Sequence, residues 1–130
     1  LEEADRITNE RIAIWQRYHE MLAPLEKKGV LRRPIIPAEC QHNAHMYYIL
    51  LAPDISRQHL LQELKKHRIH PLFHYIPLHS SPGGKRYGRT SGCLTVTDQL
   101  AERLVRLPLW VGLSKEQQTY IVTTLNNVLS

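Results

Sequence analysis

The spacing of apolar residues changes along this chain of 130 residues, and the change limits the folds that it can adopt. In the first segment the apolar side chains recur every three or four residues, with one interruption at Arg11, which predicts an amphipathic helix. They are Ala4, Ile7, Ile14, Trp15, Tyr18, Leu22 and Leu25. Residues 45–51 instead form an aromatic and β-branched run, typical of a central strand that is apolar on both faces. The chain therefore mixes helices with strands.

The first helix has a clear end but no evident start. Pro24 disfavours helical geometry in the residue before it and ends the helix near Leu22 or Ala23, and Gly29 supplies the turn that follows. Leu1 cannot cap a helix. We therefore expect residue 1 to lie inside a longer protein.

The later segments alternate in type without repeating a strand-helix-strand unit. We expect an edge strand at 32–37, a helix from Asp54 or Ser56 that buries Leu60, Leu61 and Leu64, a strand at 71–76 and a turn-rich loop at 78–89. Thr97-Asp98 opens a further helix, carrying Leu100, Leu104 and Val105 and stopping at Pro108. A capping box at 114–117 begins the last helix, which buries Ile121, Leu125 and Val128. This order predicts an α+β fold, a small sheet packed by helices.

The net charge and the cysteine content indicate the kind of partner and the cellular location of this protein. A net charge of +5 attracts anionic partners such as nucleic acid, nucleotides or sugar phosphates. Two cysteines, Cys40 and Cys93, form no disulfide framework and favour a reducing, cytoplasmic location. No apolar run reaches eighteen residues, so we expect no membrane span.

Three separated motifs carry a resemblance to a known family. They are His74-Tyr75-Ile76-Pro77-Leu78-His79 with the Ser-Ser-Pro-Gly-Gly-Lys-Arg-Tyr-Gly that follows, Arg106-Leu107-Pro108-Leu109-Trp110 with Gly112 to Gln117, and the opening from Ala4 to Arg11. In this order they resemble the C-terminal third of the DegT/DnrJ/EryC1/StrS sugar aminotransferases. One departure lies at Arg68, in a turn that usually carries glycine in this family and would strain an arginine if its φ is positive.

The resemblance implies an enzyme of two domains with different roles. Residues 1–130 would form the small C-terminal domain of a fold-type I enzyme, with residues 1–23 as the interdomain helix. The large domain would bind most of the cofactor, pyridoxal 5'-phosphate, and hold the Schiff-base lysine. The implied partners are a dTDP-sugar, glutamate and a second subunit in a homodimer. We expect no catalytic, cofactor-binding or metal-binding residue within this chain, so the chain should be inactive alone. Without the large domain, Trp15 and Tyr18 on the first helix should be exposed.

Tyr75 and His79 are the first candidates for substrate contacts. From the residues alone, Tyr75 fits a sheet core and His79 a solvated loop, whereas the resemblance places both beside the nucleotide-linked sugar. Lys85, Arg86 and Arg89 lie among glycines. They suit a diphosphate contact, a subunit boundary or a mobile basic loop equally well.

Two other functions compete with a sugar aminotransferase. Cys40, His42 and His45, with His70, His74 and His79, suggest a metal site, but the chain has no C-x2-4-C motif. His70 and His74 would also stand about 13 Å apart on a strand, too far to share an ion. A nucleic-acid-binding module needs a basic stripe on one face, and here the basic residues are scattered. We therefore expect neither metal nor nucleic acid.

Overall fold

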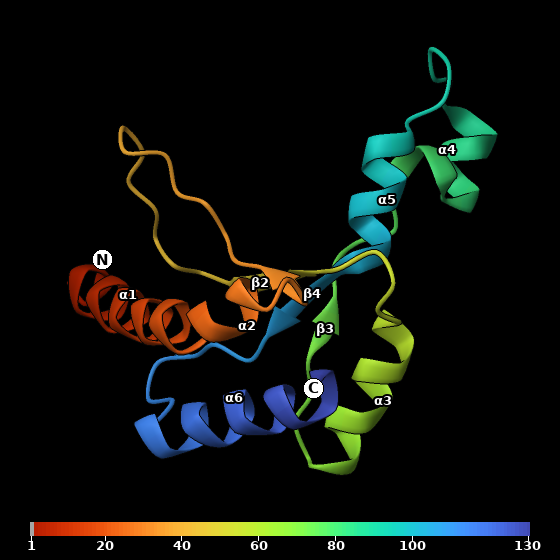
Figure 1. Ribbon diagram of the computed structural model, residues 1–130. Helices are drawn as coiled ribbons and strands as arrows, with labels where there is room; N and C mark the ends of the chain where they lie inside the picture. Colours follow the sequence, from red (N-terminus) through yellow and green to blue (C-terminus); the bar gives the residue numbers. More distant parts are fainter. Residues whose placement is uncertain (1) are drawn as a thin grey trace.

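A four-stranded antiparallel sheet organises the structure, a computed structural model that describes residues 2–130 (Figure 1). Its strands are β1 (Leu31–Arg32), β2 (Tyr47–Leu51), β3 (Leu72–Phe73) and β4 (Leu104–Leu107), in the spatial order β1-β2-β4-β3. The helices are α1 (Ala4–Met21), α2 (Ala23–Lys27), α3 (Arg57–Lys66), α4 (Pro82–Tyr87), α5 (Thr95–Arg103) and α6 (Lys115–Leu129), with one 3₁₀ turn, η1 (Leu78–Ser80). The predicted α+β class is confirmed.

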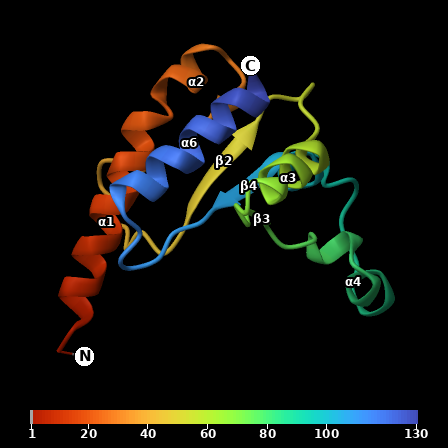
Figure 2. The same cartoon turned by 90° about the horizontal axis from the view of Figure 1, so that it is seen from below.

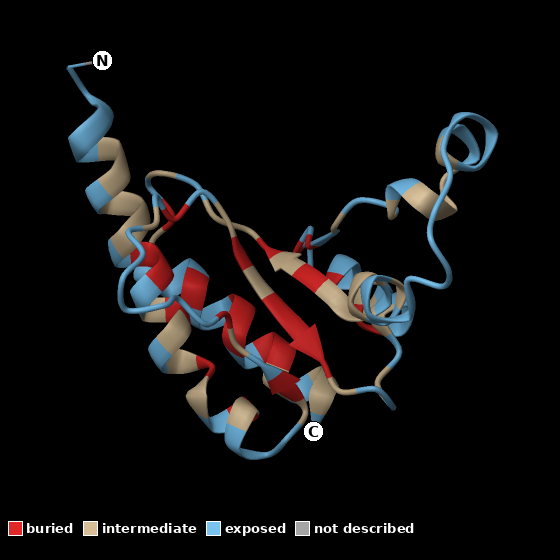
Figure 3. Ribbon diagram, turned by 90° about the horizontal axis from the view of Figure 1, so that it is seen from above, coloured by how far each residue is buried: buried red, intermediate tan, exposed pale blue. Residues whose placement is uncertain are grey.

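The core lies between one face of the sheet and the three longest helices. Tyr47, Ile49 and Leu51 alternate along β2 and point to the same face, as the two-residue period of a strand requires. α1, α3 and α6 cover that face, and in Figures 2 and 3 α1 and α6 lie alongside one another next to the buried β2. The opposite face carries Tyr48 and Arg106 on neighbouring strands and is only partly covered.

A buried polar side chain joins α1 to α6. Gln118 is fully buried; its Nε2 donates to the Ile14 carbonyl at 2.9 Å and its Oε1 accepts from Arg17 Nε at 2.6 Å. Trp15 and Tyr18 pack against the Tyr47 ring of β2 and are buried by this chain alone. The expectation that they would be exposed without a second domain is therefore wrong.

Several predicted helix ends and turns are confirmed. α1 ends at Met21, Ser56 caps α3 by accepting from the His59 amide, and Ser114 and Gln117 form the reciprocal capping box of α6. Arg68 does adopt a positive φ, at +59°, as expected if this turn keeps the geometry that usually requires glycine in the family that the sequence resembles. The short helix α2 was missed, because Pro24 begins a new helix in its first turn as well as ending the previous one.

The prediction for Leu104 and Val105 is wrong. α5 ends at Arg103, and these two residues begin β4, a central strand. The cause is long-range pairing: Val105 lies opposite Ile49 and Arg106 opposite Tyr48, and burial alternates along the strand. Nothing within four or five residues of Leu104 reveals a partner more than fifty positions away.

The segment between β3 and β4 also differs from its prediction. The strand expected at 71–76 is limited to Leu72–Phe73, and the expected loop contains η1 and α4. Residues 74–103, which we call the arm, project from the sheet (Figure 1), and none of them is buried. The arm therefore contributes no residue to the core.

Within the part of the chain that the structure describes, we find no helix with the length and apolar character needed to cross a membrane.

Candidate functional site

Two arginines fix the base of the arm to the body of the domain. Arg57 on α3 donates through Nη1 to the Ala101 carbonyl, and Arg103 donates through Nη1 to the Leu51 carbonyl at 3.3 Å. Each bond joins a charged donor to a carbonyl at an element end, and such charge-assisted bonds are stronger than neutral ones. The orientation of α5 relative to β2 is thereby set.

A pocket of about 760 Å³ lies within the arm and brings together three of the five predicted substrate-binding residues. His79, Lys85 and Arg89 all line this arm pocket, with Thr90 and Thr97 as further polar groups. Arg86 is not among its lining residues and instead places its guanidinium over the Tyr87 ring, 5.1 Å from the ring centre. The pocket therefore gathers two permanent cations and an imidazole.

His79 is held in one orientation by a carboxylate that sequence reasoning missed. Its Nε2 lies 2.9 Å from Asp98 Oδ1 on α5, and its side chain is only 16% exposed. The alternative interpretation of His79 as a freely solvated loop residue is therefore wrong. The sequence marks Asp98 only as part of a helix start, since nothing in the eighteen residues between them links it to His79.

The arm pocket depends on a close approach of backbones at Gly84. Ser81 caps α4 by accepting from the Gly84 amide, and a Cβ on Gly84 would lie 1.6 Å from the Leu78 carbonyl oxygen. Only glycine fits there without displacing η1 or α4. Gly83, one residue earlier, meets nothing within 4 Å.

Tyr75 lies outside both the core and the arm pocket. It is 73% exposed, so its interpretation as sheet core is wrong. Its ring contacts the His74 ring at 4.9 Å between centres, and the Arg106 guanidinium lies 5.6 Å from its centre. An exposed tyrosine beside a guanidinium offers an aromatic surface and a hydroxyl to a ligand.

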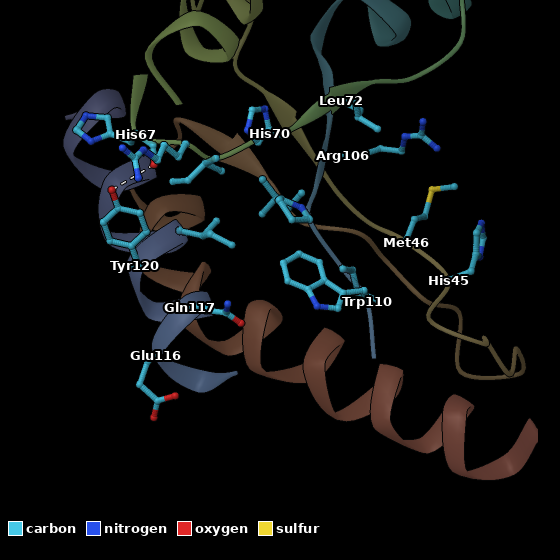
Figure 4. Close-up of a pocket in the computed structure, with 16 residues that line it drawn as sticks. His45, Met46, His67, His70, Leu72, Arg106, Trp110, Glu116, Gln117 and Tyr120 are labelled. Carbon is cyan, nitrogen blue, oxygen red and sulfur yellow. Dashed lines mark hydrogen bonds between the residues drawn. The ribbon is translucent and has the colours of Figure 1, made fainter. Parts of the chain in front are cut away.

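A second pocket of about 870 Å³ lies where β4 leaves the sheet, and we call it the sheet-end pocket. Figure 4 shows Arg106 and Leu72 side by side on one flank, toward Met46 and His45, with Tyr120 and His67 on the other flank. His70 and Trp110 lie between the two groups. No sequence pattern predicted this pocket, because its walls come from distant parts of the chain: the two residues before β2, the turn after α3, β3, β4 with the three residues after it, and α6.

The chain's lysines do not suit the anchoring of an aldehyde cofactor. A Schiff-base amine needs a shielded setting that favours its neutral form. All six lysines (27, 28, 65, 66, 85 and 115) are exposed; Lys66 pairs with Glu63 and Lys28 donates to Asn126. None of these lysines is therefore suited to form a Schiff base with such a cofactor. Within residues 2–130 no three His, Cys, Asp or Glu side chains cluster closely enough to hold a metal ion.

The sequence and the fold described above are similar to those of known proteins. The model of the DegT/DnrJ/EryC1/StrS aminotransferase family matches residues 1–126. The chain is 27% identical to the dTDP-3-amino-3,4,6-trideoxy-alpha-D-glucose transaminase of Micromonospora megalomicea subsp. nigra, covering 92% of this chain and 32% of that protein.

Solved structures agree with this match. An aminotransferase of the same family from Brucella abortus superposes with a TM-score of 0.78 at 28% identity, over 94% of this chain and 31% of the other. The aminotransferase TlmJ from Streptoalloteichus hindustanus shares the fold, with a TM-score of 0.86 at 24% identity, over 99% and 33%.

These findings identify the type of domain and the family to which the chain belongs. The four-stranded antiparallel sheet with its helices is the α+β small domain that forms the C-terminal third of sugar aminotransferases. The chain belongs to the DegT/DnrJ/EryC1/StrS aminotransferase family, whose members depend on pyridoxal phosphate. It spans about a third of the length of the relatives that it matches.

Proposed function

We propose that this chain is the substrate-covering small domain of a sugar-nucleotide aminotransferase. The intact enzyme would move an amino group from glutamate to the keto carbon of a dTDP-4-keto-6-deoxyhexose. Within the family we propose the activity of the dTDP-4-oxo-6-deoxyglucose 4-aminotransferase of enterobacterial common antigen synthesis. The observation that carries this proposal is the family match over residues 1–126, together with a pocket that gathers His79, Lys85 and Arg89.

The charges of the arm support an anionic, sugar-bearing substrate. Lys85 and Arg89 can neutralise a diphosphate, and arginine can clasp one phosphate with two hydrogen bonds. His79, oriented by Asp98, has its second ring nitrogen left to bind a hydroxyl. Tyr75 offers an exposed ring on which a sugar or base can pack. We propose that Arg86 contributes to the field around the arm pocket and does not contact the substrate.

The cofactor belongs to the remainder of the proposed enzyme. When bound, pyridoxal phosphate supplies the electron sink that lets an amino group pass between donor and acceptor. The proposed role of this chain is to close over the substrates, exclude water and hold the sugar that accepts the amino group. The proposal includes a large domain before residue 1, an interdomain helix at residues 1–23, a homodimer and a cytosolic location. Two exposed cysteines that form no disulfide, Cys40 and Cys93, support that location.

The test is an assay of the full-length protein that this proposal implies. Purified with pyridoxal phosphate, it should take on the yellow colour of bound cofactor. With glutamate it should convert dTDP-4-keto-6-deoxyglucose to a dTDP-amino sugar, detected by mass spectrometry. The 130-residue chain alone should give no product. A folded full-length protein without colour or product would refute the proposal.

The arm pocket is tested separately in the same protein. Lys85→Met and Arg89→Met should each raise KM for the dTDP-sugar about tenfold, the factor that corresponds to about 1.4 kcal/mol for one charged hydrogen bond, and leave KM for glutamate unchanged. Arg86→Met is the matched control, since Arg86 does not line the pocket. Equal effects of all three variants would show that the arm acts only through its overall charge.

A further inference from the structure

Tyr87 is an aromatic side chain to which the proposed function gives no role. It is the last residue of α4, in the outer part of the arm (Figure 1), and its side chain is 79% exposed. Tyr87 lines the arm pocket, and no other Phe, Tyr or Trp does so in the part of the chain that the structure describes. An aromatic ring that stays exposed at the wall of a pocket offers a large apolar surface to a ligand.

One face of the Tyr87 ring is already covered. The Arg86 guanidinium lies over it, with its central carbon 5.1 Å from the ring centre, within the range of a cation–π contact. Because Arg86 does not line the arm pocket and Tyr87 does, the guanidinium covers the face of the ring that is turned away from the pocket. The face toward the pocket is therefore free to stack on a second planar group.

Two cations flank Tyr87 in the sequence and in the pocket. Lys85 lies two positions before it and Arg89 two positions after it, and all three residues line the arm pocket. Neither cation takes part in an ion pair within residues 2–130, so both are available to an anion. Proteins that hold nucleic-acid bases combine such parts: the aromatic ring stacks on the base, and the basic side chains neutralise the phosphates.

The other walls of the arm pocket fit the faces and the edge of a nucleobase. Leu78 and Leu94 contribute apolar side chains, 79% and 39% exposed, and Thr90 and Thr97 contribute hydroxyls that can donate and accept hydrogen bonds. About 760 Å³ is ample for a nucleotide. A base is planar, with apolar faces and a polar edge. It matches this lining better than a sugar ring, whose hydroxyls project on all sides.

The contacts proposed for the rest of the substrate leave this surface to the base. In the proposed function His79 binds a sugar hydroxyl, while Lys85 and Arg89 neutralise the diphosphate. Tyr75, the other exposed tyrosine of the arm, lies outside the arm pocket. The base is then the largest part of the sugar nucleotide without a partner, and Tyr87 is the ring nearest in the sequence to the two cations.

We infer that Tyr87 is the platform on which the nucleobase of the sugar nucleotide stacks, with Arg86 behind the ring. This inference rests on the proposed function for the identity of the substrate. Stacking accepts any base, because every base has a π face. Tyr87 therefore selects a sugar carried by a nucleoside diphosphate over a sugar that carries phosphate alone, and it does not distinguish one base from another.

A binding measurement on the full-length protein tests this inference without using enzyme activity. The probes for calorimetric titration are dTDP and inorganic pyrophosphate, which share a diphosphate and differ in the nucleoside. Tyr87→Ala should weaken dTDP binding about five- to 150-fold, the range that corresponds to the stacking of one base, and should change pyrophosphate binding less than twofold. Tyr87→Phe keeps the ring and should bind dTDP within twofold of the wild type.

Ile76→Ala is the control for a general effect of the apolar surface of the arm. Ile76 is 60% exposed and lines neither pocket, so this variant should bind dTDP as the wild type does. The inference is overturned if Tyr87→Ala leaves dTDP binding unchanged, if it weakens pyrophosphate binding equally, or if Ile76→Ala weakens dTDP binding as much. Matching circular dichroism and unfolding curves establish that the variants fold.

Kinetics separate this inference from the proposed function. In the active enzyme, Tyr87→Ala should raise KM for the dTDP-sugar at least fivefold and leave KM for glutamate unchanged. An enzyme that transfers the amino group with the same dTDP-sugar KM after this substitution overturns the inference alone. A protein that binds dTDP through Tyr87 but transfers no amino group refutes the proposed function alone.

Discussion

Arg68 adopts a backbone conformation that favours glycine. Its φ is +59°, and its amide donates to the Lys65 carbonyl at 2.9 Å in the turn after α3. A side chain with a Cβ in this region of φ/ψ space is strained, and glycine is not.

We therefore expect Arg68→Gly to raise the free energy of unfolding by about 0.5–1 kcal/mol, the usual size of this strain. Urea denaturation of the 130-residue chain measures the change. Arg68→Ala is the control, because it removes the charge and keeps the Cβ. If alanine stabilises the chain as much as glycine, the effect comes from charge and not from the backbone.

Glu26 should make the stability of the domain depend on pH. Burial raises its pKa, but hydrogen bonds from the Arg33 amide and the Arg33 guanidinium, both at 2.7 Å, outweigh this and hold the pKa below its ordinary value. For a carboxylate with a lowered pKa, the stabilisation is present above the unfolded-state pKa and is lost as the pH falls through the folded-state pKa.

Glu26→Gln should accordingly be less stable than the wild type at pH 7. The difference between the two proteins should shrink as the pH drops below about 4.3, the ordinary glutamate value. Urea midpoints measured from pH 7 to pH 2.5 provide the test. Glu39→Gln, at an exposed position, should run parallel to the wild type at every pH. A constant difference for Glu26→Gln would mean that its effect is steric.

Gly84 links the conformation of a short element to the shape of the arm pocket. A Cβ there would collide with the Leu78 carbonyl, whereas a Cβ on Gly83 meets nothing within 4 Å. We expect Gly84→Ala to separate α4 from η1 and so displace Lys85 and His79 relative to each other. In the full-length enzyme this should raise KM for the dTDP-sugar several-fold.

Gly83→Ala is the matched control for this prediction, since the same methyl group is added one residue earlier. It should leave KM unchanged. Chemical shifts of the arm amides in labelled protein give a second measurement, and they should move widely in Gly84→Ala only. Similar kinetics for the two variants would mean that α4 does not shape the substrate site.

The elements differ in how far the sequence could predict them, and the reason is the range of the interactions that form them. Local signals were sufficient for the α6 capping box and the Ser56 cap, each formed by residues within five positions of one another, whereas the Arg68 turn was expected from the family resemblance. β4 could not be predicted, because its residues are strand only through pairing with β2 and β3.

The same distinction applies to the candidate site. His79, Lys85 and Arg89 are neighbours in the sequence, so a motif could identify them together. Asp98 contacts His79, and Arg106 lies beside Tyr75, only because the folded chain brings these distant residues together. They are as much a part of the site, but no spacing in the sequence reveals them.

At the scale of the whole molecule, the arm holds half of the large apolar and aromatic side chains that are exposed among the described residues. The arm displays six large exposed apolar or aromatic side chains and buries none of its residues, whereas the rest of the described chain buries twenty apolar residues. The six are Tyr75, Ile76, Leu78, Tyr87, Leu94 and Val96. Many exposed apolar side chains on one segment are typical of a contact with another protein surface.

We expect the 130-residue chain to self-associate through the arm, and not through Trp15 and Tyr18, which its own core buries. Ile76→Thr combined with Val96→Thr removes two methyl-rich side chains, 60% and 70% exposed, that line neither pocket. Sedimentation velocity over a concentration series should show a weight-average mass that rises for the wild type and stays near 15.2 kDa for the double variant. Ile35→Thr, at a position 73% exposed but outside the arm, should behave as the wild type. A wild-type chain that stays monomeric, or an Ile35→Thr variant that loses association equally, would show that the arm is not the contact surface.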